Sequence, residues 1–93
     1  MKLPQDYTKL KPHERRAVRE EYVKVQKGMC SYCRASLKRE PAPISSSLPV
    51  DESLFPKNFF KWPIHLHHDH KTGMTIGAVH AHCNAVMWQY HGE

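Results

Sequence analysis

The sequence has no apolar run of membrane-spanning length, few glycines and an odd number of cysteines. A transmembrane helix needs about 20 consecutive apolar residues, so a membrane partner is not expected. Three cysteines cannot all pair within one chain, so a framework of disulfides is not expected either. The N-terminus, MKLPQDYTKLKP, is charged and lacks the apolar segment of a secretory signal peptide. We therefore expect an intracellular protein in a reducing compartment.

Acidic residues are in the minority. The 93 residues include 14 Lys and Arg against nine Asp and Glu, which gives a net charge of +5. This excess indicates a polyanionic partner, although a solvated basic surface is the plainer explanation. A chain of this length forms one domain with a small core, and such domains often need a metal for stability. We expect a single domain over residues 1–93.

One amphipathic helix is predicted in the first third of the chain. Pro12 suits the first turn of a helix, and Gly28 suits its C-terminal cap. Val18, Tyr22 and Val25 recur between them at i, i+4 and i+7, so one stripe of the helix should face the core. The basic residues of the same segment then remain for solvent or for phosphate.

Two segments lack a periodic pattern. Residues 1–11 are predicted to be a flexible basic lead-in, and residues 37–62 a long Pro-rich loop. The loop contains the aromatic run Phe59-Phe60-Lys61-Trp62, which we expect to pack on the core, with stacking on nucleic-acid bases as the alternative. Loops of this length in a compact domain are usually functional or disordered.

The remaining segment, residues 63–91, is rich in histidine and is predicted to form two strands and a helix. Ile64 to His68 reads as a short strand, followed by a polar turn at Lys71-Thr72-Gly73. A second strand is predicted from Met74 to Val79 and a helix from about His80. Gly73 favours a hairpin here, because glycine takes a positive φ at no steric cost.

Two pairs of potential metal ligands have the same spacing. They are Cys30-x-x-Cys33 and His80-x-x-Cys83, and four such ligands are typical of a structural zinc site. A redox-active C-x-x-C is the alternative, but it usually stands in a βαβ context, which is not predicted here. His82 is the rival fourth ligand. We favour His80 because its i, i+3 spacing from Cys83 suits chelation.

His67, His68 and Asn84 together suggest hydrolytic chemistry. Adjacent imidazoles on a strand point to opposite sides, so one can bind a metal while the other acts on water. An amide oxygen and an imidazole nitrogen make an open site for a divalent ion. The second imidazole can take a proton from water near neutral pH. This combination fits metal-assisted phosphodiester hydrolysis.

The sequence resembles the HNH (His-Me finger, ββα-metal) endonucleases, and within them the recombination endonuclease VII group of phages. The matching pieces are Cys30-x-x-Cys33 after a helix, His65-Leu66-His67-His68-Asp69-His70-Lys71-Thr72-Gly73, and Gly77-Ala78-Val79-His80-x-x-Cys83-Asn84. The resemblance is close over residues 64–86 and loose over residues 17–33. It implies an α+β fold: a small zinc-stabilised ββα-metal domain with an N-terminal helix and the long Pro-rich loop added to it.

The resemblance also implies roles for single residues. His68 would be the general base that activates water, and His67 and Asn84 would bind the catalytic divalent ion. His70 would have a supporting or phosphate-facing role. The endonuclease VII group usually has Asp at the position of His67, so manganese, cobalt or nickel is expected to serve at lower concentration than magnesium. The structural zinc would sit on the four predicted ligands, where the group usually has four cysteines.

The implied activity is that of a phage-encoded DNA endonuclease, which nicks or cuts DNA with low sequence specificity in the host bacterial cytoplasm. The expected DNA contacts are Arg15, Arg16, Arg19, Lys57, Lys61 and Lys71. The long C-terminal helices through which endonuclease VII pairs its subunits have no counterpart here, so a monomer or weak dimer is expected. The alternatives are a non-catalytic zinc-stabilised DNA-binding module and an accessory protein that keeps the fold. Plasmid nicking with added metal distinguishes these from the enzyme.

Overall fold

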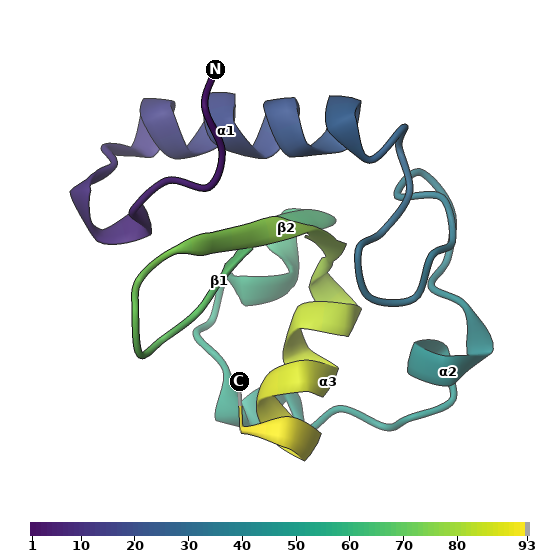
Figure 1. Ribbon diagram of the computed structural model, residues 1–93. Coiled ribbons are helices and arrows are strands. Elements are labelled where there is room, and N and C mark those ends of the chain that lie inside the picture. The colour runs from purple at the N-terminus through teal and green to yellow at the C-terminus, as the bar shows by residue number, and fades with distance from the viewer. Residues whose placement is uncertain (93) are drawn as a thin grey trace.

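The computed structural model describes residues 1–92 and has an α+β architecture (Figure 1). In chain order the elements are α1 (Pro12–Val25), α2 (Pro43–Ser46), β1 (Ile64–His68), β2 (Thr75–His80) and α3 (Ala81–His91). Short 3-10 turns occur at Tyr7–Lys9, Glu52–Leu54 and Phe59–Lys61. The predicted class, the strand–turn–strand–helix order and the approximate bounds of these elements are confirmed. The last residue of the predicted domain, Glu93, lies outside the described residues.

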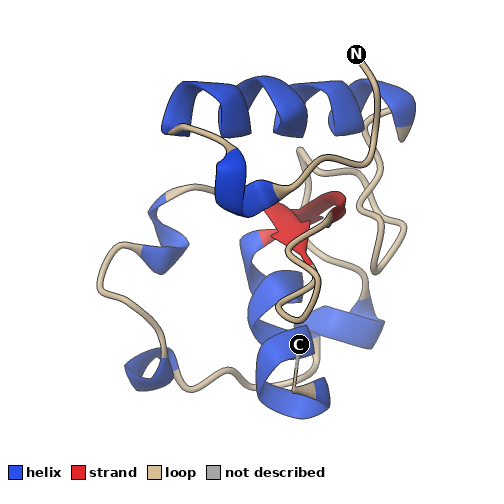
Figure 2. Ribbon diagram, turned by 60° about the vertical axis from the view of Figure 1, so that its left-hand side comes forward, coloured by secondary structure: helices blue, strands red, loops and turns tan. Residues whose placement is uncertain are grey.

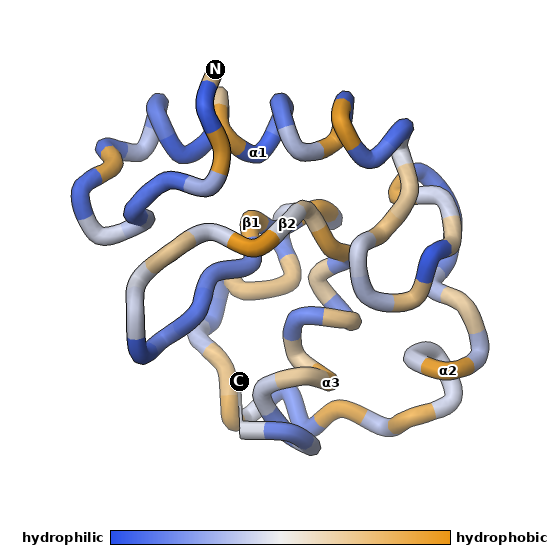
Figure 3. The backbone as a smooth tube through the Cα atoms, viewed as in Figure 1, coloured by the Kyte–Doolittle hydropathy of each residue, from blue (hydrophilic) through white to orange (hydrophobic). Residues whose placement is uncertain are grey.

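The hairpin of β1 and β2 lies between two helices. In Figure 1, α1 runs across one side of the hairpin and α3 descends from its other side. The strands are antiparallel, with Ile64 opposite His80 and a bulge between His67 and His68. Colouring by hydropathy shows apolar residues where α1, the hairpin and α3 face one another (Figure 3). Residues of all three elements make up the buried core, among them Val18, Tyr22, Leu66, Val79, Cys83 and Met87.

The predicted signals at the two ends of α1 are confirmed. Pro12 is its first residue, and the Lys11 backbone N–H donates to the Glu14 carboxylate at 2.8 Å. Beyond its last turn, Gly28 has a φ of +77° and its N–H donates to the Val23 carbonyl. Val18 and Tyr22 are buried. The predicted stripe is one residue shorter than expected, because Val25 is 62 % exposed at the end of the helix.

The outer edge of β2 is covered by residues 5–7, which the sequence predicted to be part of a flexible lead-in. The Thr75 N–H donates to the Gln5 carbonyl at 2.8 Å, and the Tyr7 N–H donates to the Gly73 carbonyl at 2.8 Å. The physical reason is that a strand edge carries backbone groups that need partners. Residues 5–7 supply these partners in the way that a further strand of the sheet would.

A glutamine side chain contacts the same edge farther along, at Ala78. The Oε1 of Gln26 accepts from the Ala78 N–H at 2.8 Å, and its Nε2 donates to the Ala78 carbonyl at 2.9 Å. The amide therefore satisfies both backbone groups of one residue, as a neighbouring strand would. The C-terminal end of α1 is fixed to β2 in this way.

The long loop contains only α2 and short turns, in agreement with the absence of a long helix or strand pattern in residues 37–62. After α2 the chain passes along α3 and returns to β1 (Figure 2). Tyr90 of α3 donates its hydroxyl to the Pro49 carbonyl at 2.6 Å. Phe55 packs against Trp88 of α3 with ring centroids 5.4 Å apart. Trp62, in contrast, is 61 % exposed.

No helix among residues 1–92 has the length and apolar character needed to cross a bilayer.

Candidate metal centre and histidine site

Four buried side chains form a compact group of potential metal ligands: Cys30, Cys33, His80 and Cys83. Their ligand atoms all lie within 4.8 Å of one another. The Nδ1 atom of His80 is 3.5 Å from the sulfur of Cys33 and 3.5 Å from that of Cys83. With zinc–sulfur bonds of about 2.3 Å and zinc–nitrogen bonds of about 2.0 Å, a tetrahedron has nitrogen–sulfur edges of about 3.5 Å. The group could therefore hold a metal, and its donors and spacing are consistent with structural zinc.

Backbone carbonyls orient the imidazole of this group. The Nε2 of His80 lies 2.9 Å from the carbonyl oxygens of both Ser36 and Arg39. A carbonyl can only accept, so the proton is on Nε2 and Nδ1 presents its lone pair to the sulfurs. Histidine ligands of metals commonly have such a partner on the second nitrogen.

The sulfurs of the group are held by hydrogen bonds as well. Cys30 Sγ accepts from the backbone N–H groups of Tyr32 at 3.4 Å and Cys33 at 3.5 Å. A hydrogen bond from the Cys83 thiol, together with N–H groups of this kind, lowers the pKa of Cys30 to about 4. The same pairing and burial raise the pKa of Cys83. A lowered pKa favours the thiolate, which is the form of cysteine that binds a metal.

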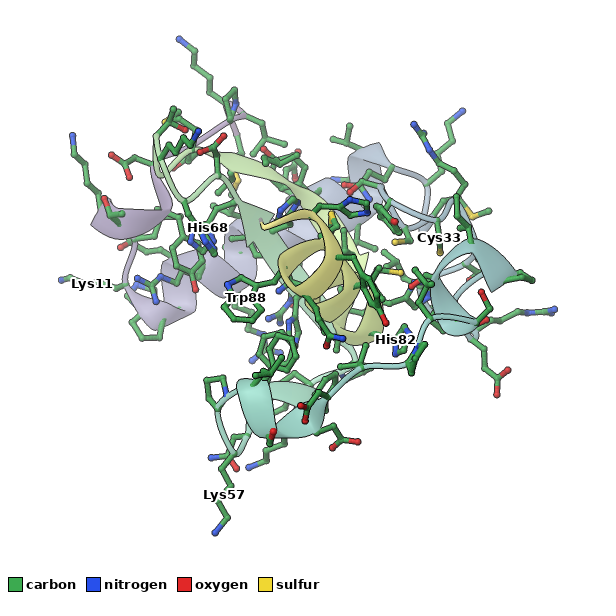
Figure 4. All side chains as sticks on the ribbon, turned by 90° about the horizontal axis from the view of Figure 1, so that it is seen from below. Lys11, Cys33, Lys57, His68, His82 and Trp88 are labelled. Carbon is green, nitrogen blue, oxygen red and sulfur yellow. The ribbon has the colours of Figure 1, made fainter. Side chains whose placement is uncertain are left out.

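The group joins two distant parts of the chain. Cys30 and Cys33 stand in a tight loop after α1, in which the Cys30 N–H donates to the Ala35 carbonyl at 2.8 Å. His80 ends β2 and Cys83 lies in the first turn of α3. The choice of His80 over His82 is confirmed, because His82 instead lies with its Nε2 2.9 Å from the Ser45 carbonyl in α2. Figure 4 shows His82 beside the segment of α2 and Cys33 on the same side of the molecule.

A cavity of about 520 Å³ lies along β1, and none of the four ligands lines it. Residues from both faces of β1 line the cavity, so the cavity follows the outer edge of this strand. These residues are Ile64, His65, Leu66 and His68. Among residues 1–92, no strand pairs with this edge. The other walls come from α1, the loop and α3. The cavity brings together three of the predicted catalytic residues, His68, His70 and Asn84.

His68 lies in an aromatic and cationic environment. Its ring stacks on Tyr7 with centroids 3.8 Å apart and planes 6° apart. The guanidinium of Arg15 lies 4.0 Å from the centroid of the same Tyr7 ring, and the His70 ring lies 4.9 Å from His68. Burial lowers the pKa of His68, and repulsion from His70 and His67 lowers it further. The imidazole is therefore neutral at pH 7 and able to accept a proton.

Asn84 is oriented by His65, a histidine to which the sequence alone assigned no role of its own. The Nδ2 of Asn84 donates to Nδ1 of His65 at 3.1 Å, which leaves Oδ1 as the amide atom able to bind a cation. His65 also meets the Phe59 ring edge-on at 4.6 Å, and burial lowers its pKa. A signal was present in the sequence, because His65 lies two residues before His67 and so on the same face of the strand.

His67 lines a different hollow. Its side chain is 5 % exposed, and with Lys71, Ile76 and His91 it borders a smaller cavity of about 280 Å³. The pairing of His67 with Asn84 around a catalytic ion stays a prediction. Because His65 contacts Asn84, it is a second candidate, beside His67, for the imidazole that would bind this ion.

The six basic residues predicted to contact DNA have different surroundings. Arg19 lines the large cavity. Arg16 instead forms an exposed ion pair with Glu20, with Nε 3.2 Å from the carboxylate. The Lys61 ammonium lies 5.3 Å from the centroid of the Trp62 ring. The other three lie in α1, the loop and the hairpin turn: Arg15, Lys57 and Lys71. Figure 4 shows Lys57 projecting from the loop into solvent.

Comparison of the chain with protein-family models, curated proteins and solved structures gives no significant match. The proposed function therefore rests on the residues of the site.

Proposed function

We propose that the protein is a metal-dependent DNA endonuclease with a ββα-metal site. The observation that carries the proposal is the cavity that His68 shares with Asn84, in which burial lowers the pKa of His68. His68 belongs to the hairpin and Asn84 to α3. The four potential zinc ligands include His80 and Cys83, which lie at the junction of β2 and α3. This is the residue set on which the resemblance to HNH endonucleases rests, and the net charge of +5 suits a DNA substrate.

The chemistry assigned to the chain's own residues is proton transfer and positioning. Nε2 or Nδ1 of neutral His68 takes a proton from a water molecule, whose oxygen attacks phosphorus as the bond to the leaving oxygen breaks. The leaving oxygen takes a proton from solvent. Asn84, with His67 or His65, would hold a divalent ion that supplies charge stabilisation to the phosphate. His70, beside His68, supports the base or faces the phosphate.

The stack on Tyr7 supports His68 as the base. A general base must keep one orientation, because proton transfer depends on its distance from the reacting water. The parallel Tyr7 ring restricts rotation of the imidazole, and the cation near Tyr7 discourages protonation of His68.

Plasmid nicking tests the proposal. Wild type, His68→Ala and the control His13→Ala, which changes an exposed histidine of α1, are compared with manganese, cobalt, nickel and magnesium. We expect nicking by wild type and His13→Ala, with manganese, cobalt or nickel effective at lower concentration than magnesium. His68→Ala should lose on the order of a hundredfold in rate, as is typical when a general base is removed.

DNA binding by His68→Ala should change little, because affinity comes mainly from contacts of Lys and Arg with phosphate. An unchanged nicking rate in this variant would remove His68 as the base. DNA binding without nicking in any of the four ions would favour the non-catalytic DNA-binding module instead.

A further inference from the structure

The large cavity has an aromatic wall that the proposed hydrolysis does not use. Phe55, Phe59 and Trp62 of the long loop and Trp88 of α3 line it. Trp62 and Trp88 are the two tryptophans of the chain, and they are 61 % and 43 % exposed. Figure 4 shows Trp88 on the same side of the molecule as His68. Two large rings thus remain in solvent beside the proposed base.

The rings of this wall do not stack on one another. The ring plane of Phe55 makes an angle of 66° with that of Trp88 and of 38° with that of Phe59. Tilted and edge-on contacts of this kind leave ring faces available for a planar ligand. The polar groups near the wall are amides and imidazoles, which can donate to or accept from the edge of such a ligand.

The charge of the cavity indicates which planar ligand it suits. Its lining contains one guanidinium, that of Arg19, beside three histidines, and no Asp or Glu among the described residues. A neighbouring hollow of about 320 Å³ shares Arg19, Trp62 and Ile64 with it, so the groove continues along α1, where Glu20, the ion-pair partner of Arg16, also borders it. A planar group attached to an anionic chain fits both the aromatic wall and the guanidinium of Arg19.

We propose that this cavity binds an unstacked nucleobase of single-stranded DNA. This inference rests on the proposed function and specifies its substrate as a strand with accessible bases. A base inside a duplex cannot reach the wall, because its faces are covered by its neighbours. In the bound state the base lies against Trp62 or Trp88, and the adjoining phosphate lies between Arg19 and the edge of β1 that holds His68.

Intrinsic fluorescence tests the proposal directly, because both tryptophans of the chain line this cavity. Wild-type protein is titrated, without added divalent ion, with oligothymidylate, an abasic oligodeoxynucleotide of equal length and a blunt duplex. We expect quenching by oligothymidylate and binding on the order of tenfold tighter than to the abasic strand, as one stacked base contributes. Equal quenching and equal affinity for the two single strands would overturn the proposal.

A matched pair of variants assigns the effect to the cavity. Trp62→Ala removes an exposed ring of the wall, and Tyr90→Ala removes a ring of α3 that contacts Pro49 outside it. We expect Trp62→Ala to lose most of the preference for oligothymidylate over the abasic strand, Trp62→Phe to recover part of it, and Tyr90→Ala to keep it. Equal losses in Trp62→Ala and Tyr90→Ala would contradict a base site at this wall. Thermal melting of each variant checks the fold.

The binding result and the nicking result are independent. A protein that prefers oligothymidylate to the abasic strand, yet cuts neither plasmid nor single-stranded DNA in any of the four ions, has the base site and is not a nuclease. A protein that nicks plasmid but binds both strands equally is a nuclease without the base site.

Discussion

The properties of His68 depend on neighbours from distant parts of the sequence. Tyr7 comes from the N-terminal segment, and its partner Arg15 from α1. The third neighbour, His70, is close in sequence and lies in the hairpin turn. Each of them affects either the orientation or the charge of one imidazole. Two of the three neighbours, Tyr7 and Arg15, therefore lie outside the motif that contains the predicted base.

The first prediction at this scale concerns the titration of His68. Its pKa should lie below the ordinary 6.5, because burial and the neighbouring histidines disfavour the imidazolium. Between the lowered pKa and 6.5 the folded state binds fewer protons at His68 than the unfolded state. Stability should therefore fall as pH is lowered through that window. The nicking rate should be flat down to about pH 6.5 and fall only below it.

Histidine ring signals in NMR spectra, recorded without added divalent ion, measure the pKa of His68. In His70→Asn the pKa of His68 should rise toward 6.5, because the repulsion from His70 that helps to lower it is removed. A pKa above 6.5 in the wild type, or no change in the variant, would show that these neighbours do not set the charge of His68.

At the scale of elements, the two edges of the hairpin differ. Residues 5–7 and the Gln26 amide cover the outer edge of β2. The outer edge of β1 borders the cavity instead. The covered edge fixes α1 and the N-terminal segment to the sheet, and the other edge is left to the candidate site.

Gly77 tests how tightly the covered edge is packed. A Cβ atom at this position would lie 2.8 Å from the Ser31 hydroxyl and 2.9 Å from Gln26 Oε1. We expect Gly77→Ala to destabilise the fold by about 1–3 kcal/mol, measured by thermal or urea unfolding. The comparison variant is Gly28→Ala, where a Cβ meets nothing within 4 Å and only the positive φ is penalised. A Gly77→Ala protein as stable as wild type would show that the contact between α1 and β2 yields easily.

A second prediction at this scale concerns two arginines of α1. Arg19 lines the cavity, whereas Arg16 is paired with Glu20. We expect binding of DNA to weaken steeply with salt, and Arg19→Ala to reduce the slope of log K against log salt by about one. Arg16→Ala should change the slope less. Titrations at several salt concentrations measure both, and a flat salt response in the wild type would argue against phosphate contacts altogether.

The sequence predicted the elements and the ligands that depend on local spacing. The strand Ile64–His68 and the two ligand pairs follow from periodicity and from spacings of three residues. The contacts of Gln26 with Ala78 and of Tyr7 with His68 did not follow, because they join residues far apart in the chain. Their partners depend on how the elements pack, which a single sequence does not encode in any local pattern.

For the whole molecule, the group of four potential metal ligands joins the segment after α1 to the junction of β2 and α3. A chain of this size has a small core, so these ligands should supply a large part of the stability. The loop and the hairpin lie between the two halves of the group in the sequence. Loss of the metal should therefore affect the cavity as well as the centre itself.

The corresponding prediction compares two neighbouring histidines. We expect about one zinc per chain in wild type and in His82→Ala, and loss of zinc and of cooperative melting in His80→Ala, in Cys83→Ser or after chelation. His82→Ala is the matched control, because His82 contacts the Ser45 carbonyl and stands outside the group. Elemental analysis and thermal melting provide the measurements. A zinc-free sample that melts like the wild type would refute a stabilising metal.

The position of the long loop has a consequence for how this protein can change. The chain leaves the metal-binding group at Cys33 and returns to it at His80, so residues 37–62 form part of a closed ring. Lengthening such a ring by ten residues costs only about 0.2 kcal/mol in closure entropy. The exposed stretch around Ser53 should therefore accept insertions or grafted segments. Recognition can then be redesigned through the loop while the hairpin and its ligands are left untouched.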